Sequence, residues 1–130
     1  MLDINVWSDM SYKTTKKDFE VFQKECEKWI EYFGLKGWFI FFQHHELNEN
    51  NMAELSFHTG TRNAGIHFNA SREKKPSLSE IRETAFHEAC ELLLAPMSDL
   101  IFEKYLQEET QGVCHQVIAA LRNTIFKESL

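Results

Sequence analysis

The chain contains 130 residues, of which 43% are hydrophobic and 26% are charged. This length predicts a single domain over residues 1–130, and the composition excludes intrinsically disordered and fibrous proteins. The formal net charge is −6 at pH 7 and the basic residues are mostly scattered, so we expect no strong nucleic-acid binding.

The first elements are a lead-in, a helix and a strand. Residues 1–13 show no periodicity and predict a loosely ordered lead-in, and no basic residue precedes an apolar stretch, so we expect no secretory signal. A helix is expected from Thr14 or Thr15 to Gly34, because its apolar residues recur at steps of three and four. Residues 37–47 are apolar on both alternating faces, which predicts a strand covered on two sides. Its apolar run is far too short to cross a bilayer, so we expect no membrane partner.

Residues 53–70 predict a β-hairpin, because two short strands flank a glycine-bounded turn at residues 61–64. One register collects the apolar side chains on a single side of this hairpin. It pairs Phe57 with Phe68, Thr59 with Ile66 and Leu55 with Ala70, and it places His58 beside His67.

Two helices follow a polar loop. A capping box at residues 77–80 predicts a helix over residues 78–94 that stops at Pro96. A last helix is expected from residue 98 or 99 to about residue 126. The order of one helix, three strands and two helices predicts an α+β fold with a small, three-stranded, mainly antiparallel sheet.

The strongest candidate for chemistry is the segment HEACE, residues 87–91, in the first of these two helices. His87 and Glu91 are four residues apart, so they share one helix face and could both bind one metal ion. Glu88 lies next to them, where a glutamate could take a proton from a water activated by the metal. The segment alone is weak evidence, because so short a pattern also arises by chance.

A catalytic zinc site needs a third protein ligand. His115 is our main candidate, because the turn at Ala95–Pro96 would fold the last helix back beside the first. Two histidines and one glutamate would then form the ligand set of several zinc hydrolases. Glu108, Glu109 and Cys114 are alternatives, of which Cys114 is better suited to the core and Glu108 shares a helical stripe with His115.

The remaining histidines and the cysteines indicate structural roles. His58 and His67 could hold a second metal ion, but a solvent-facing pair is the more common meaning of such neighbours. His44 and His45 point to opposite faces of a strand, so they cannot share an ion without a bend. The three cysteines, Cys26, Cys90 and Cys114, form no close pairs and favour a reducing compartment such as the cytoplasm.

The segments IRETAFHEACELLLAPM and HQVIAAL resemble the small zincin-like metallopeptidases of bacteriophages and prophages. In that family a helix and a short sheet precede a His-Glu-x-x-His helix and a later ligand helix. The resemblance covers about Leu35 to Leu121. Glu91 stands where the family has its second histidine, and His115 stands near its glutamate, so the ligand set is kept with its order changed. The resemblance implies a phage- or prophage-encoded protein in the cytoplasm of a bacterial host.

We therefore expect a zinc-dependent metallohydrolase that cleaves a peptide or protein substrate. One zinc ion would bind His87, Glu91 and His115, and Glu88 would activate the water. The alternative is a catalytically inactive zincin-like module that binds another protein, because one fold hosts many functions. Stoichiometric zinc in the purified protein would favour the enzyme. The sequence predicts neither the natural substrate nor the oligomeric state.

Overall fold

The computed structural model describes residues 12–48, 50–105 and 107–130. Residues 1–11 of the expected lead-in lie outside this part of the chain. Its last two residues, Tyr12–Lys13, do not belong to a loose lead-in but form strand β1, which pairs antiparallel with β5 (Ser71–Arg72). This small second sheet ties the start of the first helix to the loop that follows the main sheet.

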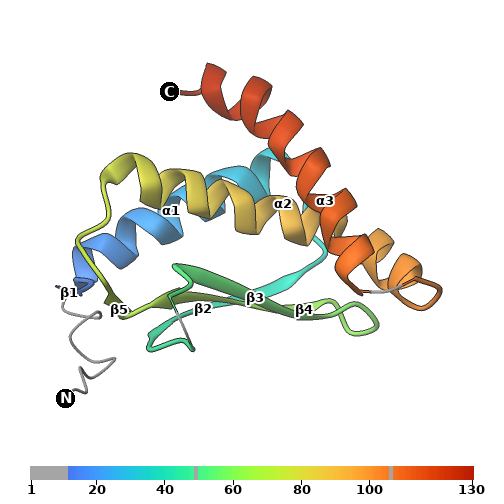
Figure 1. Cartoon of the computed structure of the whole chain (residues 1–130), viewed down its shortest axis with the longest axis horizontal. Helices are drawn as coiled ribbons and strands as arrows, with labels where there is room; N and C mark the ends of the chain where they lie inside the picture. Colours follow the sequence, from blue (N-terminus) through green and yellow to red (C-terminus); the bar gives the residue numbers. More distant parts are fainter. Residues whose placement is uncertain (1–11, 49, 106) are drawn as a thin grey trace, which may run out of the picture.

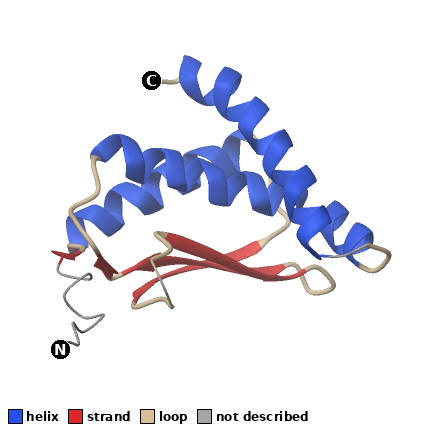
Figure 2. Ribbon diagram, in the orientation of Figure 1, coloured by secondary structure: helices blue, strands red, loops and turns tan. Residues whose placement is uncertain are grey.

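The structure has the expected α+β architecture, in two layers (Figures 1 and 2). Helices α1 (Lys16–Tyr32) and α2 (Leu78–Phe102) pack against each other and cover one face of the three-stranded sheet. Helix α3 (Gln107–Leu121) crosses beside the C-terminal part of α2 (Figure 1). In the described part of the chain, no helix combines the length and the apolar character needed to cross a membrane.

Helix α1 begins and ends where the sequence predicts. The Thr15 hydroxyl accepts a hydrogen bond from the Asp18 amide, and the Asp18 carboxylate accepts one from the Thr15 amide, both at 3.0 Å. This capping box satisfies two amides that have no partner within the helix. Gly34 follows the helix with φ +69°, a left-handed conformation that glycine adopts without steric cost.

The main sheet is mixed rather than mainly antiparallel. Its strands are β2 (Phe39–His45), β3 (Ala53–His58) and β4 (Asn63–Asn69), in the spatial order β2-β4-β3. β4 pairs antiparallel with β3 but parallel with β2. The sequence shows the β3–β4 hairpin through its short turn, whereas the pairing of β2 with β4 joins distant segments that no local signal identifies.

The hairpin is shifted by four positions from the expected register. Phe57 lies opposite Ala64 rather than Phe68, and Leu55 lies opposite Ile66. The cause is the loop, which ends at Arg62 with φ +57°, so β4 begins earlier than expected. Because the shift is an even number of residues, the apolar side chains stay on the predicted face.

The shift removes the expected pairing of His58 with His67. His58 lies opposite Asn63, and His67 lies opposite Glu54. The two histidines therefore form no shared site.

Strand β2 is covered on one face only, in contrast to the expectation of a strand buried on both sides. Its residues alternate between exposed and half-buried along the whole strand. Phe39 and Phe41 point away from the helices and remain 74% and 49% exposed. The aromatic composition of β2 suggested two-sided burial, but both α1 and α2 lie on the opposite face of the sheet.

Helix α2 does not stop at Pro96, as expected, but continues to Phe102. The capping box at Ser77 and Glu80 is present as predicted. Pro96 removes one helical amide donor, yet Leu94 and Ala95 before it are buried in the core, and this packing holds the helix on its course. α3 consequently begins at residue 107 rather than 98, and it passes into a π-helical turn, η2 (Arg122–Phe126).

Two apolar clusters form the core. One lies between the helices and the sheet, and the other lies between α1, α2 and the C-terminal helices. The first contains Phe22, Cys26, Ile66, Phe68, Ile81 and Ala85, and the second contains Trp29, Phe86, Ala89, Cys90, Leu94, Ile118 and Phe126.

A buried carboxylate also connects α1 to α2. Glu25 is 8% exposed and accepts hydrogen bonds from the Trp29 indole at 2.8 Å and from the Arg82 guanidinium at 3.1 Å. Both partners compensate for the removal of the carboxylate from water. This network fixes the packing of α2, the helix that carries the candidate site.

Candidate metal centre

Two of the expected ligands lie on one face of α2. Nε2 of His87 is 3.6 Å from Oε2 of Glu91, one helical turn further on. The neighbouring residues Phe86, Ala89 and Cys90 are buried in the core. Their burial sets the rotation of α2 about its axis and turns the other face, with His87 and Glu91, toward solvent.

Helix α3 adds the third residue. Nε2 of His115 lies 3.7 Å from the same Glu91 oxygen, and the ring centroids of His87 and His115 are 5.3 Å apart. One potential ligand atom from each of the three residues lies within 4.8 Å of the other two. The structure therefore brings together the three residues that the sequence suggested as ligands.

The alternatives to His115 do not join this group. In the part of the chain that the structure describes, His87, Glu91 and His115 are the group of potential ligands that lies closely enough to share an ion. Glu108 and Glu109 are exposed in the first turn of α3. Cys114 packs against the second core cluster, as its helical position predicted.

The two distances from Glu91 to the histidines are close to those between ligands of a tetrahedral metal ion. Ligand atoms about 2.0–2.1 Å from a tetrahedral ion lie about 3.4 Å from one another. The two distances to Glu91, 3.6 and 3.7 Å, need only small side-chain adjustments to reach this value. The side chains of His87, Glu91 and His115 are 38%, 33% and 53% exposed, so a further ligand could approach from solvent.

Glu88 is buried beside this group. It is 4% exposed, and its Oε1 atom has no hydrogen-bond partner among the described residues. Burial raises the pKa of the Glu88 carboxyl well above its usual range, and the charge of Glu91, a hydrogen bond with Glu91 and the charge of Glu54 raise it further. An unpartnered buried carboxyl oxygen is rare in proteins and is found at sites with a catalytic or ligand-binding role.

The pKa of the Glu91 carboxyl is shifted in the opposite direction, downward. Burial alone would raise the pKa of its carboxyl, but hydrogen bonds and charge from His87 and His115 lower it overall. Glu91 is therefore the more acidic of the two carboxyls, and Glu88 holds a proton more readily. An ionised carboxylate flanked by two imidazoles is the state in which all three side chains can bind a cation.

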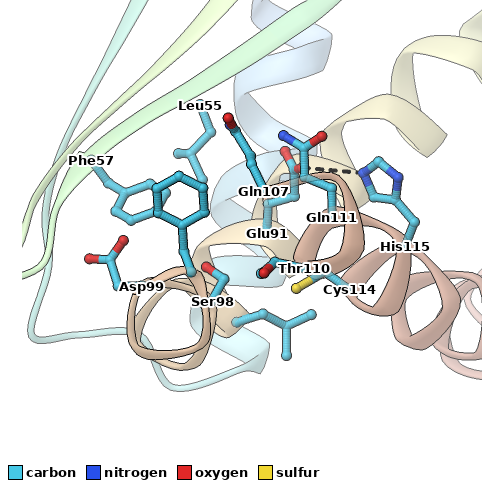
Figure 3. Close-up of a pocket in the computed structure, with 12 residues that line it drawn as sticks. Leu55, Phe57, Glu91, Ser98, Asp99, Gln107, Thr110, Gln111, Cys114 and His115 are labelled. Atoms are coloured by element: carbon cyan, nitrogen blue, oxygen red, sulfur yellow. Dashed lines mark ion pairs between the residues drawn. The ribbon is translucent and has the colours of Figure 1, made fainter. Parts of the chain in front are cut away.

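A cavity of about 360 Å³ opens next to two of the three residues, Glu91 and His115. Glu91 and His115 lie on one side of it, and Asp99 and Ser98 lie on the other (Figure 3). Leu55 of β3 contributes to its wall. The sequence did not indicate this cavity, because it exists only where α2 continues past Pro96 and faces both β3 and α3.

Three polar side chains form a chain of hydrogen bonds on the outer face of the sheet. Nε2 of His45 and Nδ1 of His67 are 3.0 Å apart, and Nε2 of His67 is 3.0 Å from the Ser56 hydroxyl. The partner of His67 is thus His45 on the adjacent strand and not His58. These residues lie on the face of the sheet opposite to the helices.

His44 has the structural role that its position predicted. Its ring stacks on Phe19 of α1 with centroids 5.0 Å apart, and its Nε2 lies 2.7 Å from the Thr14 hydroxyl. The Thr14 hydroxyl donates to the carbonyl of Asn69, so His44 Nε2 must be the donor to Thr14. Burial lowers the pKa of His44; the charge of Asp18 opposes this shift, and the charge of His45 adds to it.

The cysteines do not form a reactive site. All three are free thiols, and Cys26 and Cys90 are buried. Burial raises the pKa of Cys26 well above its usual value and that of Cys90 to about 12. A thiol must ionise to act as a nucleophile, so these two are core residues.

No family model, curated protein or solved structure matches the chain. The similarity to zincin-like phage proteins therefore stays a prediction.

Proposed function

We propose that this protein is a metal-dependent hydrolase and, more specifically, a zinc peptidase. The observation that carries the proposal is the convergence of His87, Glu91 and His115 from two helices onto one point. Two imidazoles and one carboxylate are a ligand set of zinc hydrolases. The unpartnered oxygen of Glu88 beside them supports the proposal, because a general base must have an oxygen free to accept a proton.

Each of the four side chains would have its own task. A bound Zn²⁺ would supply Lewis acidity, which lowers the pKa of water toward 7 and polarises a carbonyl group. His87, Glu91 and His115 would hold the ion. The charge of the ion would favour the ionised form of Glu88, which would then accept the proton of the attacking water and deliver it to the leaving amine.

The free edge of β3 offers a place for the main chain of a peptide. β3 is an outer strand of the sheet, and Leu55 and Phe57 on its inner face line the same cavity as Glu91 and His115. An extended peptide could hydrogen-bond to this edge and pass the three metal-binding side chains. We place the activity in a reducing compartment such as the cytoplasm, because all three thiols are free. Membership of the phage zincin-like family belongs to the same proposal.

The variant Glu88→Gln tests this function. We expect it to retain one zinc per chain and to lose peptide hydrolysis by about a hundredfold or more, since removing a general base typically has this effect. Glu83→Gln is the matched control, because Glu83 lies exposed on the same helix and pairs with Arg122. Metal analysis and hydrolysis of a mixed peptide library give the two readouts.

Two outcomes would contradict the proposal. Full activity of Glu88→Gln would show that this carboxyl is not the base. Absence of stoichiometric zinc from the carefully purified wild-type protein would instead favour a non-catalytic module that binds another protein.

A further inference from the structure

The cavity beside the metal centre combines apolar walls with a carboxylate at its far side. Its apolar surface comes from both layers of the fold, and Asp99 and Ser98 lie away from His115 (Figure 3). The apolar side chains are Leu55 and Phe57 of β3 and Leu94 and Phe102 of α2.

Asp99 is a carboxylate without a countercharge. Its Oδ2 accepts a hydrogen bond of 2.6 Å from the Thr59 hydroxyl, which orients the group. No ion pair of Asp99 is found among the described residues, and neither lysine nor arginine lines the cavity there. The second acidic side chain of the lining is Glu91. The side of the cavity around Asp99 is therefore suited to a positive charge, and no lysine or arginine of the lining supplies one there.

The position of Asp99 requires a long side chain. Asp99 follows Glu91 by two turns of α2, which corresponds to about 12 Å along the helix axis. A substrate held at the metal centre must bridge most of this distance before its side chain meets the carboxylate. Lysine and arginine are the side chains that combine such length with an apolar stem and a cationic end.

The cavity is large enough to admit a long side chain. Its volume of about 360 Å³ lies at the lower end of the range of about 300–1,000 Å³ for small-ligand pockets. The methylenes of a basic side chain would contact Leu55, Phe57 and Phe102, and its cationic group would reach Asp99. A neutral side chain of the same shape would leave Asp99 without its ionic partner.

We propose that this cavity is a specificity pocket for a lysine or arginine side chain, bound by the Asp99 carboxylate. The inference rests on the proposed function, because it assumes that the substrate is a peptide that passes the metal centre. Under this proposal, the substrates of the peptidase carry a lysine or arginine side chain that enters the cavity.

The test compares two blocked tripeptides whose central residue is arginine or its neutral isostere citrulline. Binding to the metal-free protein is measured by NMR titration. We expect the arginine peptide to bind at least about tenfold more tightly, since a hydrogen bond to a charged partner is worth about 1.5–3 kcal/mol. Asp99→Asn should remove this preference. Glu103→Gln, which changes an exposed carboxylate just after α2, should preserve it.

The same peptides separate this proposal from the proposed function. Equal affinity for the two peptides, no measurable binding of either, or a preference that survives Asp99→Asn overturns the pocket assignment. An Asp99-dependent preference without hydrolysis by the zinc-loaded protein supports the pocket and contradicts the peptidase. Hydrolysis of both peptides at equal rates supports the peptidase and overturns the pocket.

Discussion

Zinc should stabilise the wild-type fold and fail to stabilise His87→Ala. A ligand that binds only the folded state adds about 2.7 kcal/mol to the free energy of unfolding at one hundred times its Kd. For a domain of this size, 1 kcal/mol corresponds to roughly 4 °C in melting temperature, so we expect a rise of about 10 °C. The assay is thermal unfolding followed by circular dichroism, with a chelator and with excess free zinc.

The structure explains why the loss of zinc binding in His87→Ala can be separated from any loss of stability in the metal-free protein. The His87 side chain is 38% exposed and pairs with Glu91 at 3.6 Å, so its loss should cost the metal-free protein at most about 1 kcal/mol. His58→Ala is the control, because His58 is exposed on β3 and contacts Thr61 rather than the metal centre. An equal zinc-induced rise in His87→Ala and wild type would refute the assignment of His87 as a ligand.

Three further predictions concern the ligand order, the core and pH. Glu91→His and His115→Glu should each weaken zinc binding, and the double variant should recover more affinity than the two singles predict; additive changes in a double-mutant cycle would rule out a shared ion. Glu25→Ala should lower the free energy of unfolding, measured by urea denaturation, by about 3 kcal/mol, because it leaves the buried Trp29 indole and the Arg82 guanidinium without their acceptor. Glu27→Ala, which changes an exposed residue of the same helix, should alter the free energy of unfolding little. The pKa of His44 is lowered in the folded state, so the unfolded chain takes up a proton at higher pH, and the free energy of unfolding should fall as pH drops below about 6.5. His44→Gln should make the dependence of the free energy of unfolding on pH shallower. An unchanged dependence would contradict the reasoning.

Local signals predicted the starts of α1 and α2. Thr15 is the N-cap of α1, one of the two expected positions, and the capping box at Ser77 and Glu80 is formed as the sequence indicated, because it uses side chains only three residues apart. The expectation that α2 ends at Pro96 was wrong, because burial of the preceding residues outweighs the missing hydrogen bond. Termination of a helix depends on tertiary packing, which the residues around the proline do not reveal.

The sheet was predictable in its strands but not in its pairing. Alternation placed the apolar residues of β3 and β4 on the correct face, but the register depended on the loop that ends at Arg62. The parallel pairing of β2 with β4 joins segments that β3 separates along the chain. No spacing within either strand encodes such a partner.

In the candidate site, too, the local spacing of residues was predictable and their tertiary placement was less so. His87 and Glu91 were predictable as neighbours because one helical turn brings them together. His115 was expected on the correct helix, although that helix begins nine residues later than predicted, at Gln107 instead of position 98. Asp99 was expected at the start of the last helix, so its place in the cavity wall could not be foreseen.

Few residues of α3 are buried, and this affects how a bound ion would be released. Only Thr110 and Ile118 are buried within this helix, whereas α2 has nine buried residues. Segments with little burial open locally while the remainder of a protein stays folded. We therefore expect α3 to be the first helix to exchange its amide protons, carrying His115 away from α2 as it opens. Metal loss would then follow the kinetics of this local opening, and a bound ion would slow amide exchange in α3 far more than in α1.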